Sequence, residues 1–360
     1  MSKTDGSQYA PDPIPAPVVK PGEFTFAAIG LDHGHIYGMS EGLIGAGADL
    51  KWVYDPDPAK TKAFAEKFPQ VKIANSEAEV LDDPAVQLVA GAAITSDRCA
   101  LGLRVMDAGK DYFTDKAPLT TLEQLEQAKA AVARTGKKYA VYYSERLHVE
   151  TAVFAAQLIA DGAIGRVVQV MGTGPHRLNA KIRPAWFFEK EKYGGILCDI
   201  GSHQIEQILF YTGAKDGKIG RSQIGNYANP QYPGLDDFGD AMLDLDNGST
   251  GYFRCDWLTP DGLQTWGDGR SIILGTEGFI EQRKYMQLGD KKAGPGHLYL
   301  ANGEEETHFN VSGKVGYPYF GELILDCLNR TEIAMTQEHA FKAAELSVKA
   351  QMQAVELTGR

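Results

Sequence analysis

The feature that most constrains the fold is a regular alternation of short apolar runs and helical patterns between residues 24 and 143. The apolar runs include Phe24 to Ile29, Leu50 to Tyr54, Val86 to Ala93 and Asp111 to Thr114. The third of these has no polar side chain beyond Gln87, which is typical of a parallel strand buried on both faces. The alternation predicts a doubly wound α/β domain.

The pattern changes after about residue 150. A helix over 150–161 leads to a strand over 167–172, and from residue 236 onward the expected strands follow one another with little helix between them. The chain then returns to helix over 319–328 and roughly 338–357. Runs of strands with few helices predict a second, mostly antiparallel α+β domain.

A chain of 360 residues is longer than one hydrophobic core usually serves, so two domains are expected. We place an α/β domain over 23–146, an α+β domain for substrate binding and oligomerisation over 147–336, and a C-terminal helix over 337–360. Residues 1–22 are a Pro-rich arm. Its composition favours a disordered tail, and the alternative is an arm that packs on another subunit.

Composition narrows the class of protein. The net charge of −11 argues against nucleic acid or an anionic membrane as a partner, because both reward clustered lysine and arginine. The first ten residues lack a signal-type apolar run, and no stretch approaches the roughly 20 apolar residues of a membrane helix. The four cysteines have no metal-ligand spacing. These observations predict a reduced, cytoplasmic protein.

A candidate dinucleotide site follows the first strand, where Gly30 and Gly34 could form the tight turn of a Rossmann domain. Asp32 stands where the second glycine of the usual motif belongs, and we expect it to point away from phosphate and cap the helix. Neighbouring candidate cofactor contacts are His33, His35 and Ile36, and after the fourth strand Ile94 and Thr95. The two histidines could equally be polar residues at a helix end.

Asp55 ends the second strand, 25 residues after Gly30. A carboxylate there accepts hydrogen bonds from the adenosine ribose and repels a 2′-phosphate, so NAD is favoured over NADP. The alternative is an ordinary loop aspartate.

Two further motifs carry chemistry. Asp115-Lys116-Ala117-Pro118 follows the fifth strand, and a glycine pair at Gly194 and Gly195 precedes Asp199 and His203. On a helix, residues four apart share a face, so the Asp199 carboxylate could orient the His203 imidazole or share its proton.

These motifs, in this order, resemble the glucose–fructose oxidoreductase / inositol dehydrogenase / MocA family over residues 24–357. Asp115 to Pro118 resembles its glutamate–lysine–proline motif, with Asp for Glu and an inserted Ala, and Gly194 to His203 matches its glycine-rich Asp-x-x-x-His segment. The resemblance implies a Rossmann domain followed by a domain with a large open sheet, which the family uses for oligomerisation. A homodimer or homotetramer is therefore expected.

The resemblance also implies a division of labour. Lys116 would lie near the nicotinamide and the reacting hydroxyl, and stabilise a developing alkoxide. His203 would act as general base, since an imidazole titrates near neutrality, and Asp199 would bind a substrate hydroxyl and set the histidine. The cofactor would supply the hydride chemistry.

Substrate contacts are expected from polar and aromatic side chains near the cleft, which suit hydroxyl groups and sugar rings. In addition to Asp199 and His203, the candidates are Tyr142, Arg146, His176, Arg183 and Trp186. We expect no metal site, because His33 and His35 are two residues apart and no ligand cluster is evident.

Three functions remain open. The first is a sugar or polyol dehydrogenase that exchanges NAD with solvent. The second is an enzyme that holds NAD(H) tightly and uses it internally, for glycoside oxidation at C3, redox-assisted glycoside cleavage or sugar–sugar hydride exchange. The third is a non-enzymatic sugar or NAD sensor. Retention of Lys116, Asp199 and His203 favours an enzyme.

Overall fold

Six parallel strands form the first sheet in the computed structural model, which describes residues 9–12 and 14–357. Their order is β3-β2-β1-β4-β5-β6. Because the chain starts in the middle and winds outward in both directions, a crevice opens at the carboxyl ends of β1 and β4. The predicted Rossmann domain is confirmed.

The helices of this domain begin where the sequence supplies caps. Asp57 accepts a hydrogen bond from the Ala59 N–H, with Pro58 in the first turn, and Thr121 accepts one from the Gln124 N–H. The elements are β1 (Thr25–Ile29), α1 (His35–Gly45), β2 (Asp49–Tyr54), α2 (Pro58–Lys67), β3 (Lys72–Ile73), α3 (Glu77–Leu81), β4 (Leu88–Gly91), α4 (Arg98–Asp107), β5 (Asp111–Asp115), α5 (Leu122–Thr135) and β6 (Tyr139–Tyr142).

A nine-stranded sheet forms the second domain, in the order β14-β13-β12-β11-β7-β10-β9-β8-β15. Its pairs are antiparallel except β7 with β10 and β8 with β15, so the expected mostly antiparallel sheet is confirmed. The elements are α6 (Ser144–Leu147), α7 (Glu150–Ala160), β7 (Val167–Pro175), α8 (Lys190–Tyr193), α9 (Ile196–Asp199), α10 (Gly201–Thr212), β8 (Gly217–Gly225), β9 (Phe238–Leu245), β10 (Thr250–Asp256), β11 (Arg270–Gly275), β12 (Gly278–Arg283), β13 (His297–Asn302), β14 (Glu306–Asn310), α11 (Pro318–Asn329), α12 (Gln337–Met352) and β15 (Val355–Glu356).

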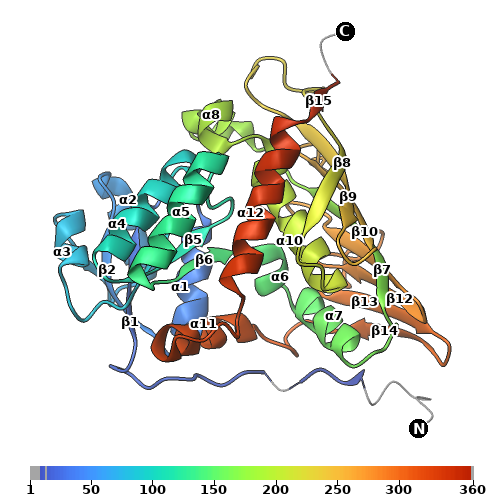
Figure 1. Cartoon of the computed structure of the whole chain (residues 1–360), viewed down its shortest axis with the longest axis horizontal. Coiled ribbons are helices and arrows are strands. Elements are labelled where there is room, and N and C mark those ends of the chain that lie inside the picture. The colour runs from blue at the N-terminus through green and yellow to red at the C-terminus, as the bar shows by residue number, and fades with distance from the viewer. Residues whose placement is uncertain (1–8, 13, 358–360) are drawn as a thin grey trace.

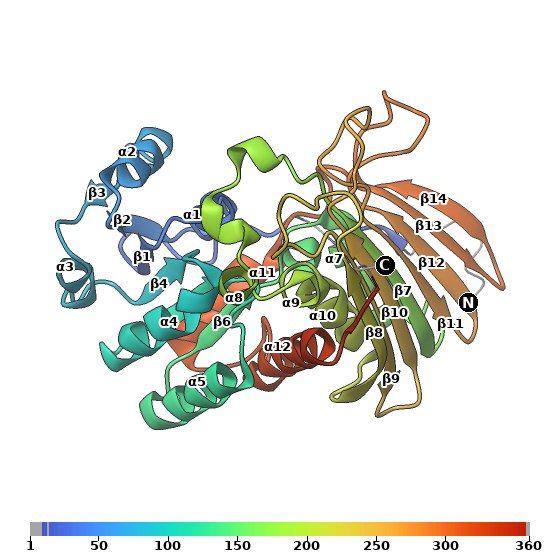
Figure 2. The ribbon, with the colours of Figure 1, turned by 90° about the horizontal axis from the view of Figure 1, so that it is seen from above.

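Helices cover one face of this sheet and leave the other open. Figures 1 and 2 show α10 and α12 between the two sheets, where α10 packs on β7 and α12 packs on both β8 and α5. On the uncovered face, the strand register aligns Met242, Tyr252, Met171 and Ile272 in one row across β9, β10, β7 and β11. Three of the four, Met242, Met171 and Ile272, are exposed large apolar residues.

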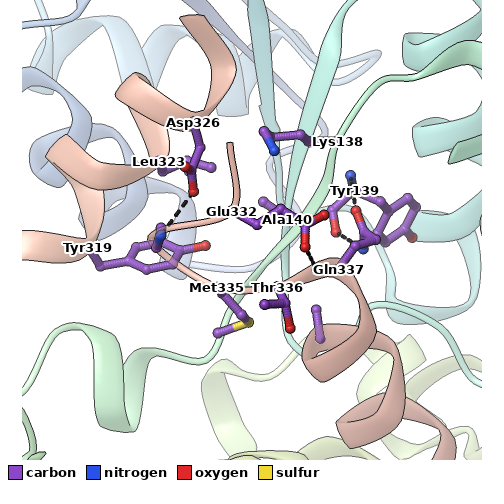
Figure 3. A pocket seen from close by; sticks show the side chains of 12 residues that line it. Lys138, Tyr139, Ala140, Tyr319, Leu323, Asp326, Glu332, Met335, Thr336 and Gln337 are labelled. Carbon is purple, nitrogen blue, oxygen red and sulfur yellow. Dashed lines mark hydrogen bonds between the residues drawn. The ribbon is translucent and has the colours of Figure 1, made fainter. Parts of the chain in front are cut away.

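The C-terminal segment differs from the expected single helix. Helix α12 ends at Met352, and Val355–Glu356 adds a short parallel strand to the edge of the large sheet. Gln337, the first residue of α12, binds the edge strand β6 of the first sheet. Its side-chain amide accepts a hydrogen bond from the Tyr139 N–H and donates one to the Tyr139 carbonyl, both at 2.9 Å (Figure 3). Helix α12 therefore joins the two domains.

Helix α11, which the predicted boundaries place in the second domain, packs on the first. The Phe320 ring lies 6.4 Å from Phe113 and 6.1 Å from Tyr142, measured between centroids. It also lies against Gly42 of α1, where an added Cβ would come within 2.2 Å of the ring. Glycine at position 42 is therefore needed for the contact between α1 and α11.

The described part of the Pro-rich arm lies along the chain's own surface, so the preference for a disordered tail is wrong for residues 9–12 and 14–22 (Figure 1). Tyr9 is only 1% exposed, the Gln157 side chain binds the backbone of Ala10 and Asp12, and the Val18 N–H donates to the Ala46 carbonyl. The expectation for residues 1–8 and 13 lies outside the described residues. None of the helices in the described ranges has the length and apolar character to cross a membrane.

Candidate functional site

A cleft of about 430 Å³ opens at the carboxyl edge of the first sheet, under the segment that follows β7. Both domains contribute to its walls. The residues that line it are Asp32, His33, Gly34, His35, Lys116, His176, Arg177, Asn179, Ile182, Arg183, Pro184, Trp186, Phe187, Asp199, Trp257 and Trp266. The cleft lies at the position where doubly wound sheets bind their ligands.

The turn after β1 suits a pyrophosphate. Gly30 has φ +75°, and an added Cβ would lie 2.9 Å from the Ala93 Cβ. Helix α1 begins at His35 without a side-chain cap, and a Cβ on Gly34 would meet nothing within 4 Å. The uncapped N–H groups at a helix N-terminus, with open space beside them, fit an anionic group such as a dinucleotide pyrophosphate.

Asp32 does not cap α1, contrary to expectation. Its Oδ1 pairs with Lys60 Nζ at 2.6 Å, and its Oδ2 accepts the Ile94 N–H at 3.2 Å. Lys60 supplies the nearest positive charge, so it offsets the cost of a carboxylate in the cleft wall.

Asp55 braces the same turn from the end of β2. It accepts hydrogen bonds from the Leu31 N–H at 2.7 Å and the Asp57 N–H at 2.9 Å, and Lys60 Nζ lies 3.7 Å from its Oδ1. Its side chain is only 1% exposed and does not line the cleft. The glycine turn and the uncapped helix therefore fit a bound NAD, and Asp55 holds that turn from behind.

Asp115 gathers a cluster that the sequence spacing did not suggest. His35 Nδ1 is hydrogen-bonded to its Oδ1 at 2.8 Å, His33 Nδ1 lies 2.8 Å from its Oδ2, and Arg98 donates to Oδ2 at 3.0 Å. Burial alone would raise the pKa of Asp115, but the charges of His35, Arg98 and His33 hold it well below its usual range.

The ligand atoms of His33, His35 and Asp115 all lie within 4.8 Å of one another, close enough to share a metal ion. The expectation that no ligand cluster exists is therefore wrong, because the end of β5 brings a carboxylate to the two histidines. The contacts of the Asp115 carboxylate also account for the cluster without an ion.

Lys116 and Asp199 form a buried ion pair, with Nζ 2.7 Å from Oδ1 and side chains 4% and 11% exposed. Burial would raise the pKa of Asp199, but the Lys116 ammonium, through its charge and its hydrogen bond, lowers it overall. Asp199 ends α9 and His203 lies in α10, so the two belong to successive helices. Among the described residues, the Asp199 carboxylate is hydrogen-bonded to Lys116 and not to the His203 imidazole.

His203 does not line the cleft: it is 1% exposed, and its ring centroid lies 6.5 Å from that of His35, which does line it. Among the described residues, neither of its ring nitrogens has a hydrogen-bond partner. Burial lowers the pKa of His203 to about 3, aided by the charges of Lys116, His35 and His176 and opposed by that of Glu145. The imidazole is therefore neutral at physiological pH.

The predicted substrate contacts divide into two groups. His176, Arg183 and Trp186 line the cleft, and Arg183 stacks over the Phe187 and Trp257 rings at 4.5 and 5.0 Å. Tyr142 and Arg146 do not line it.

The two residues outside the cleft have partners of their own. The Tyr142 hydroxyl bonds His148 Nδ1 at 2.5 Å. Arg146 pairs with Glu206 at 2.6 Å and lies over the Phe210 ring, 3.8 Å from its centroid. Both partners of Arg146 lie in α10, so these contacts hold its side chain against that helix and outside the cleft.

Three predicted cofactor contacts do not line the cleft. Ile36 and Thr95 are buried, and Ile94 is partly buried and donates its N–H to Asp32.

Two tryptophans of the cleft were not predicted from the sequence. Trp257 follows β10, and Trp266 lies in the loop before β11 with 42% of its surface exposed. Their rings flank His176, whose centroid lies 5.2 Å from that of Trp257 and 4.4 Å from that of Trp266. A large aromatic ring exposed in a loop rich in glycine and proline was the available signal.

Sequence comparison matches both domains to one family. Residues 26–143 match the model of an oxidoreductase family with an NAD-binding Rossmann fold, and residues 153–281 match the GFO/IDH/MocA C-terminal domain. The chain belongs to the GFO/IDH/MocA family. Its first domain is an NAD-binding domain of that oxidoreductase family, as the resemblance implied.

Two curated relatives are enzymes. A D-xylose dehydrogenase of Paenarthrobacter nicotinovorans is 30% identical over 153 residues, covering 40% of this chain and 38% of the relative. A scyllo-inositol 2-dehydrogenase (NAD(+)) of Bacillus subtilis is 27% identical over 237 residues, covering 65% of this chain and 66% of the relative. The chain thus spans less than two thirds of the length of these relatives.

Solved structures share the fold over nearly the whole chain. A presumed oxidoreductase from Erwinia carotovora atroseptica SCRI1043 is 51% identical, with a TM-score of 0.90, covering 93% of this chain and all of the other. A levoglucosan dehydrogenase in complex with NADH and levoglucosan has a TM-score of 0.74 at 16% identity, covering 92% and 96% of the two chains. At that identity it supports the fold alone.

Proposed function

We propose that the protein is an NAD-dependent dehydrogenase that oxidises a carbinol carbon of a sugar, polyol or glycoside, or reduces the corresponding ketone. The observation that carries the proposal is the buried Lys116–Asp199 pair in a cleft with tryptophan walls; His203 is buried near it, with its ring 6.5 Å from that of His35 in the cleft lining. The D-xylose and scyllo-inositol dehydrogenases among the relatives agree with this class of substrate.

Each of the three residues has a role that its surroundings support. The His203 imidazole is neutral and has no hydrogen-bond partner in the described part of the chain, and it takes the hydroxyl proton. The Lys116 ammonium, held by Asp199 at 2.7 Å, donates a hydrogen bond to the oxygen as negative charge develops. Bound NAD would accept the hydride from the carbinol carbon.

The side chains that line the rest of the cleft would contact the remainder of the substrate. The Trp186, Trp257 and Trp266 rings provide apolar faces for the C–H groups of a sugar ring. Arg183 and Asn179 offer donors for hydroxyl groups. A ring-shaped polyhydroxy substrate matches this combination better than a purely apolar one.

The test is reduction of NAD⁺ by purified protein with a panel that includes D-xylose, scyllo-inositol and alkyl glucosides. We expect turnover with at least one of them and its loss in His203→Gln and Lys116→Ala. His308→Gln, in β14 at the edge of the large sheet, is the matched control and keeps the parent rate. Full activity in both site variants would overturn the assignment of roles.

A retained cofactor is distinguishable in the same preparation. A nicotinamide absorbance that persists through dialysis, without net reduction of added NAD⁺, would favour internal hydride exchange. Tight sugar binding with no turnover across the panel would favour a sensor. Neither result is expected, because the cleft is open and all three reacting side chains are present.

We also propose a homo-oligomer in which the uncovered face of the nine-stranded sheet meets another copy. The row Met242, Tyr252, Met171 and Ile272 crosses four neighbouring strands, with Leu274 and Phe279 beside it. A continuous apolar row of this kind on a soluble domain marks a protein interface. The closed point groups usual for such assemblies favour a dimer or tetramer.

A further inference from the structure

Two histidines and a carboxylate meet at the wall of the cleft, and the proposed reaction uses none of them. His33 lies in the turn after β1, His35 begins α1, and Asp115 ends β5. Strands β1 and β5 both pair with β4, so their carboxyl ends lie at the same edge of the sheet. The donor atoms of the three side chains lie within 4.8 Å of one another, with each histidine Nδ1 2.8 Å from an Asp115 oxygen.

The orientation of the His33 ring is not that of a hydrogen bond to Asp115. The Nδ1 atom of His33 is buried and lies 2.8 Å from Asp115 Oδ2, yet it has no hydrogen-bond partner within the described ranges. A hydrogen bond weakens steeply when the N–H does not point at its acceptor. Donor atoms that share a metal ion also stand close together, but each directs its lone pair at the ion between them. Charge attraction holds His33 near Asp115, and a shared ion would account for the direction of the ring.

The Asp115 carboxylate is fixed by donors other than the histidines. Its Oδ1 accepts the Lys116 backbone N–H at 2.8 Å, and its Oδ2 accepts from Arg98 at 3.0 Å. Arg98 is 1% exposed and also donates to the Ala93 and Ala117 carbonyls. Each carboxylate oxygen has two lone pairs, so one on each oxygen is left for the histidines or for an ion between them. Ligating carboxylates in metal sites are held by outer hydrogen bonds in the same way.

The kinds of donor atom select the class of ion. Two imidazoles and a carboxylate suit zinc and similar divalent transition metals, whereas magnesium and calcium prefer oxygen ligands. Donor atoms about 2.0–2.2 Å from one ion lie up to about 4.2 Å apart, so these side chains could close on zinc with shifts of about half an ångström.

The nearby positive charges oppose a cation and set an upper limit on its affinity. Arg98 pairs with Asp115 itself, whereas Asp199 offsets the charge of Lys116 at 2.7 Å. We therefore expect weaker binding than at a structural zinc site with four protein ligands.

We propose that His33, His35 and Asp115 bind a divalent transition-metal ion, with zinc the best match, through the two Nδ1 atoms and the carboxylate. Three protein ligands leave a coordination position open, as at catalytic zinc sites. His33 and His35 line the cleft and Asp115 does not, so the open position is on the cleft side. This inference goes beyond the proposed function, and its test needs neither sugar nor NAD.

Calorimetric titration of untagged, chelator-treated protein with Zn²⁺ is the first measurement. We expect one site per chain in the parent protein. His33→Gln and His35→Gln should each weaken that site about 100-fold or more, because changes outside the ligand shell already cost about 10–100-fold. Mg²⁺ should not compete for it. Absence of a saturable site for one Zn²⁺ per chain, or equal affinity in the parent and both variants, overturns the proposal.

The matched control removes a histidine from a second pair. His297 Nδ1 lies 2.9 Å from His308 Nε2, in strands β13 and β14 of the large sheet. His308→Gln should keep the parent's affinity for Zn²⁺; loss of the site in this variant would place the ion there and contradict the proposal. The histidines are substituted in preference to Asp115, because removing that carboxylate leaves Arg98 buried without its partner. Thermal unfolding shows which variants are folded.

Cobalt provides a readout in the parent protein itself, which does not depend on the folding of any variant. Co²⁺ bound by nitrogen and oxygen donors at low coordination number absorbs visible light more strongly than hydrated Co²⁺. We expect such bands on adding Co²⁺ to the parent protein, their disappearance on adding Zn²⁺, and their absence in His35→Gln. A spectrum identical to that of Co²⁺ in buffer contradicts the proposal.

Discussion

Lys116→Met is the substitution whose effect on stability follows most directly from the structure. It removes the ammonium 2.7 Å from Asp199 and keeps the apolar stem, so it leaves a carboxylate with an 11% exposed side chain without its main partner. Removing one member of a buried pair destabilises a protein by about 3–5 kcal/mol. For 360 residues unfolding as one unit, this corresponds to a fall in Tm of about 4–7 °C.

The loss of stability in Lys116→Met should become smaller as the pH falls. In the parent protein the folded-state pKa of Asp199 is lowered, so its stabilising contribution is present above the unfolded pKa and is lost only as pH falls through the folded value. Without Lys116, burial raises the folded pKa above the unfolded one. The variant then regains stability as Asp199 takes up a proton, and the Tm gap narrows between about pH 7 and pH 5.

Thermal unfolding of three variants at both pH values provides the assay. Lys116→Met/Asp199→Asn should recover most of the loss at neutral pH, because both charges are gone. Lys110→Met is the matched control: its buried ammonium donates to the Asp83 and Val86 carbonyls, so its Tm gap should not narrow in acid. A Lys116→Met protein with a Tm within about 1 °C of the parent's, or a Tm gap independent of pH, would show that the Lys116–Asp199 pair does not stabilise the fold.

Three further predictions concern the cleft and the open sheet. Trp266→Ala should raise KM for the active sugar several-fold with little change in kcat, because the ring lines the cleft beside His176 and has no part in the proposed proton and hydride transfer; an unchanged KM contradicts its place in the substrate site. Asp55→Ser should increase the ratio of NADP⁺ to NAD⁺ turnover, since it removes a negative charge that would repel a 2′-phosphate, while Lys60 keeps its pair with Asp32; a ratio equal to the parent's contradicts this. Ile272→Glu should lower the mass measured by light scattering to that of a smaller species, with Lys62→Glu on α2 of the first domain as control; an unchanged mass argues against this interface.

The sequence was sufficient for elements whose signals are local. The strands of the first sheet have near-continuous apolar runs, and caps at Asp57 and Thr121 mark where two helices begin. By contrast, β8 (Gly217–Gly225) contains three glycines and several polar residues. Its strand conformation follows from pairing with β9 and β15, which a local pattern does not contain.

The candidate site, too, was predicted from the sequence only in part. The residue types at 116, 199 and 203 pointed to proton and hydride chemistry, yet the spacing of Asp199 and His203 suggested a mutual contact that the structure replaces with the Lys116–Asp199 pair. Lys116 comes from β5's end, 83 residues earlier in the chain, so only the packed fold reveals this choice of partner. In the same way, Arg146 pairs with Glu206 of another helix, and Trp266 lines the cleft from a loop; both contacts depend on the packed fold rather than on the neighbouring sequence.

In the proposed reaction, hydride passes between a carbinol carbon and NAD while His203 takes or returns the hydroxyl proton. The most direct measurement uses the panel sugar that turns over, deuterated at the reacting carbon, with NAD⁺ and mass analysis of the reduced nicotinamide. We expect one deuterium per reduced nicotinamide in the parent protein and almost no reduced product in His203→Gln. Reduced nicotinamide without deuterium, or label transfer at the parent rate in His203→Gln, would contradict it.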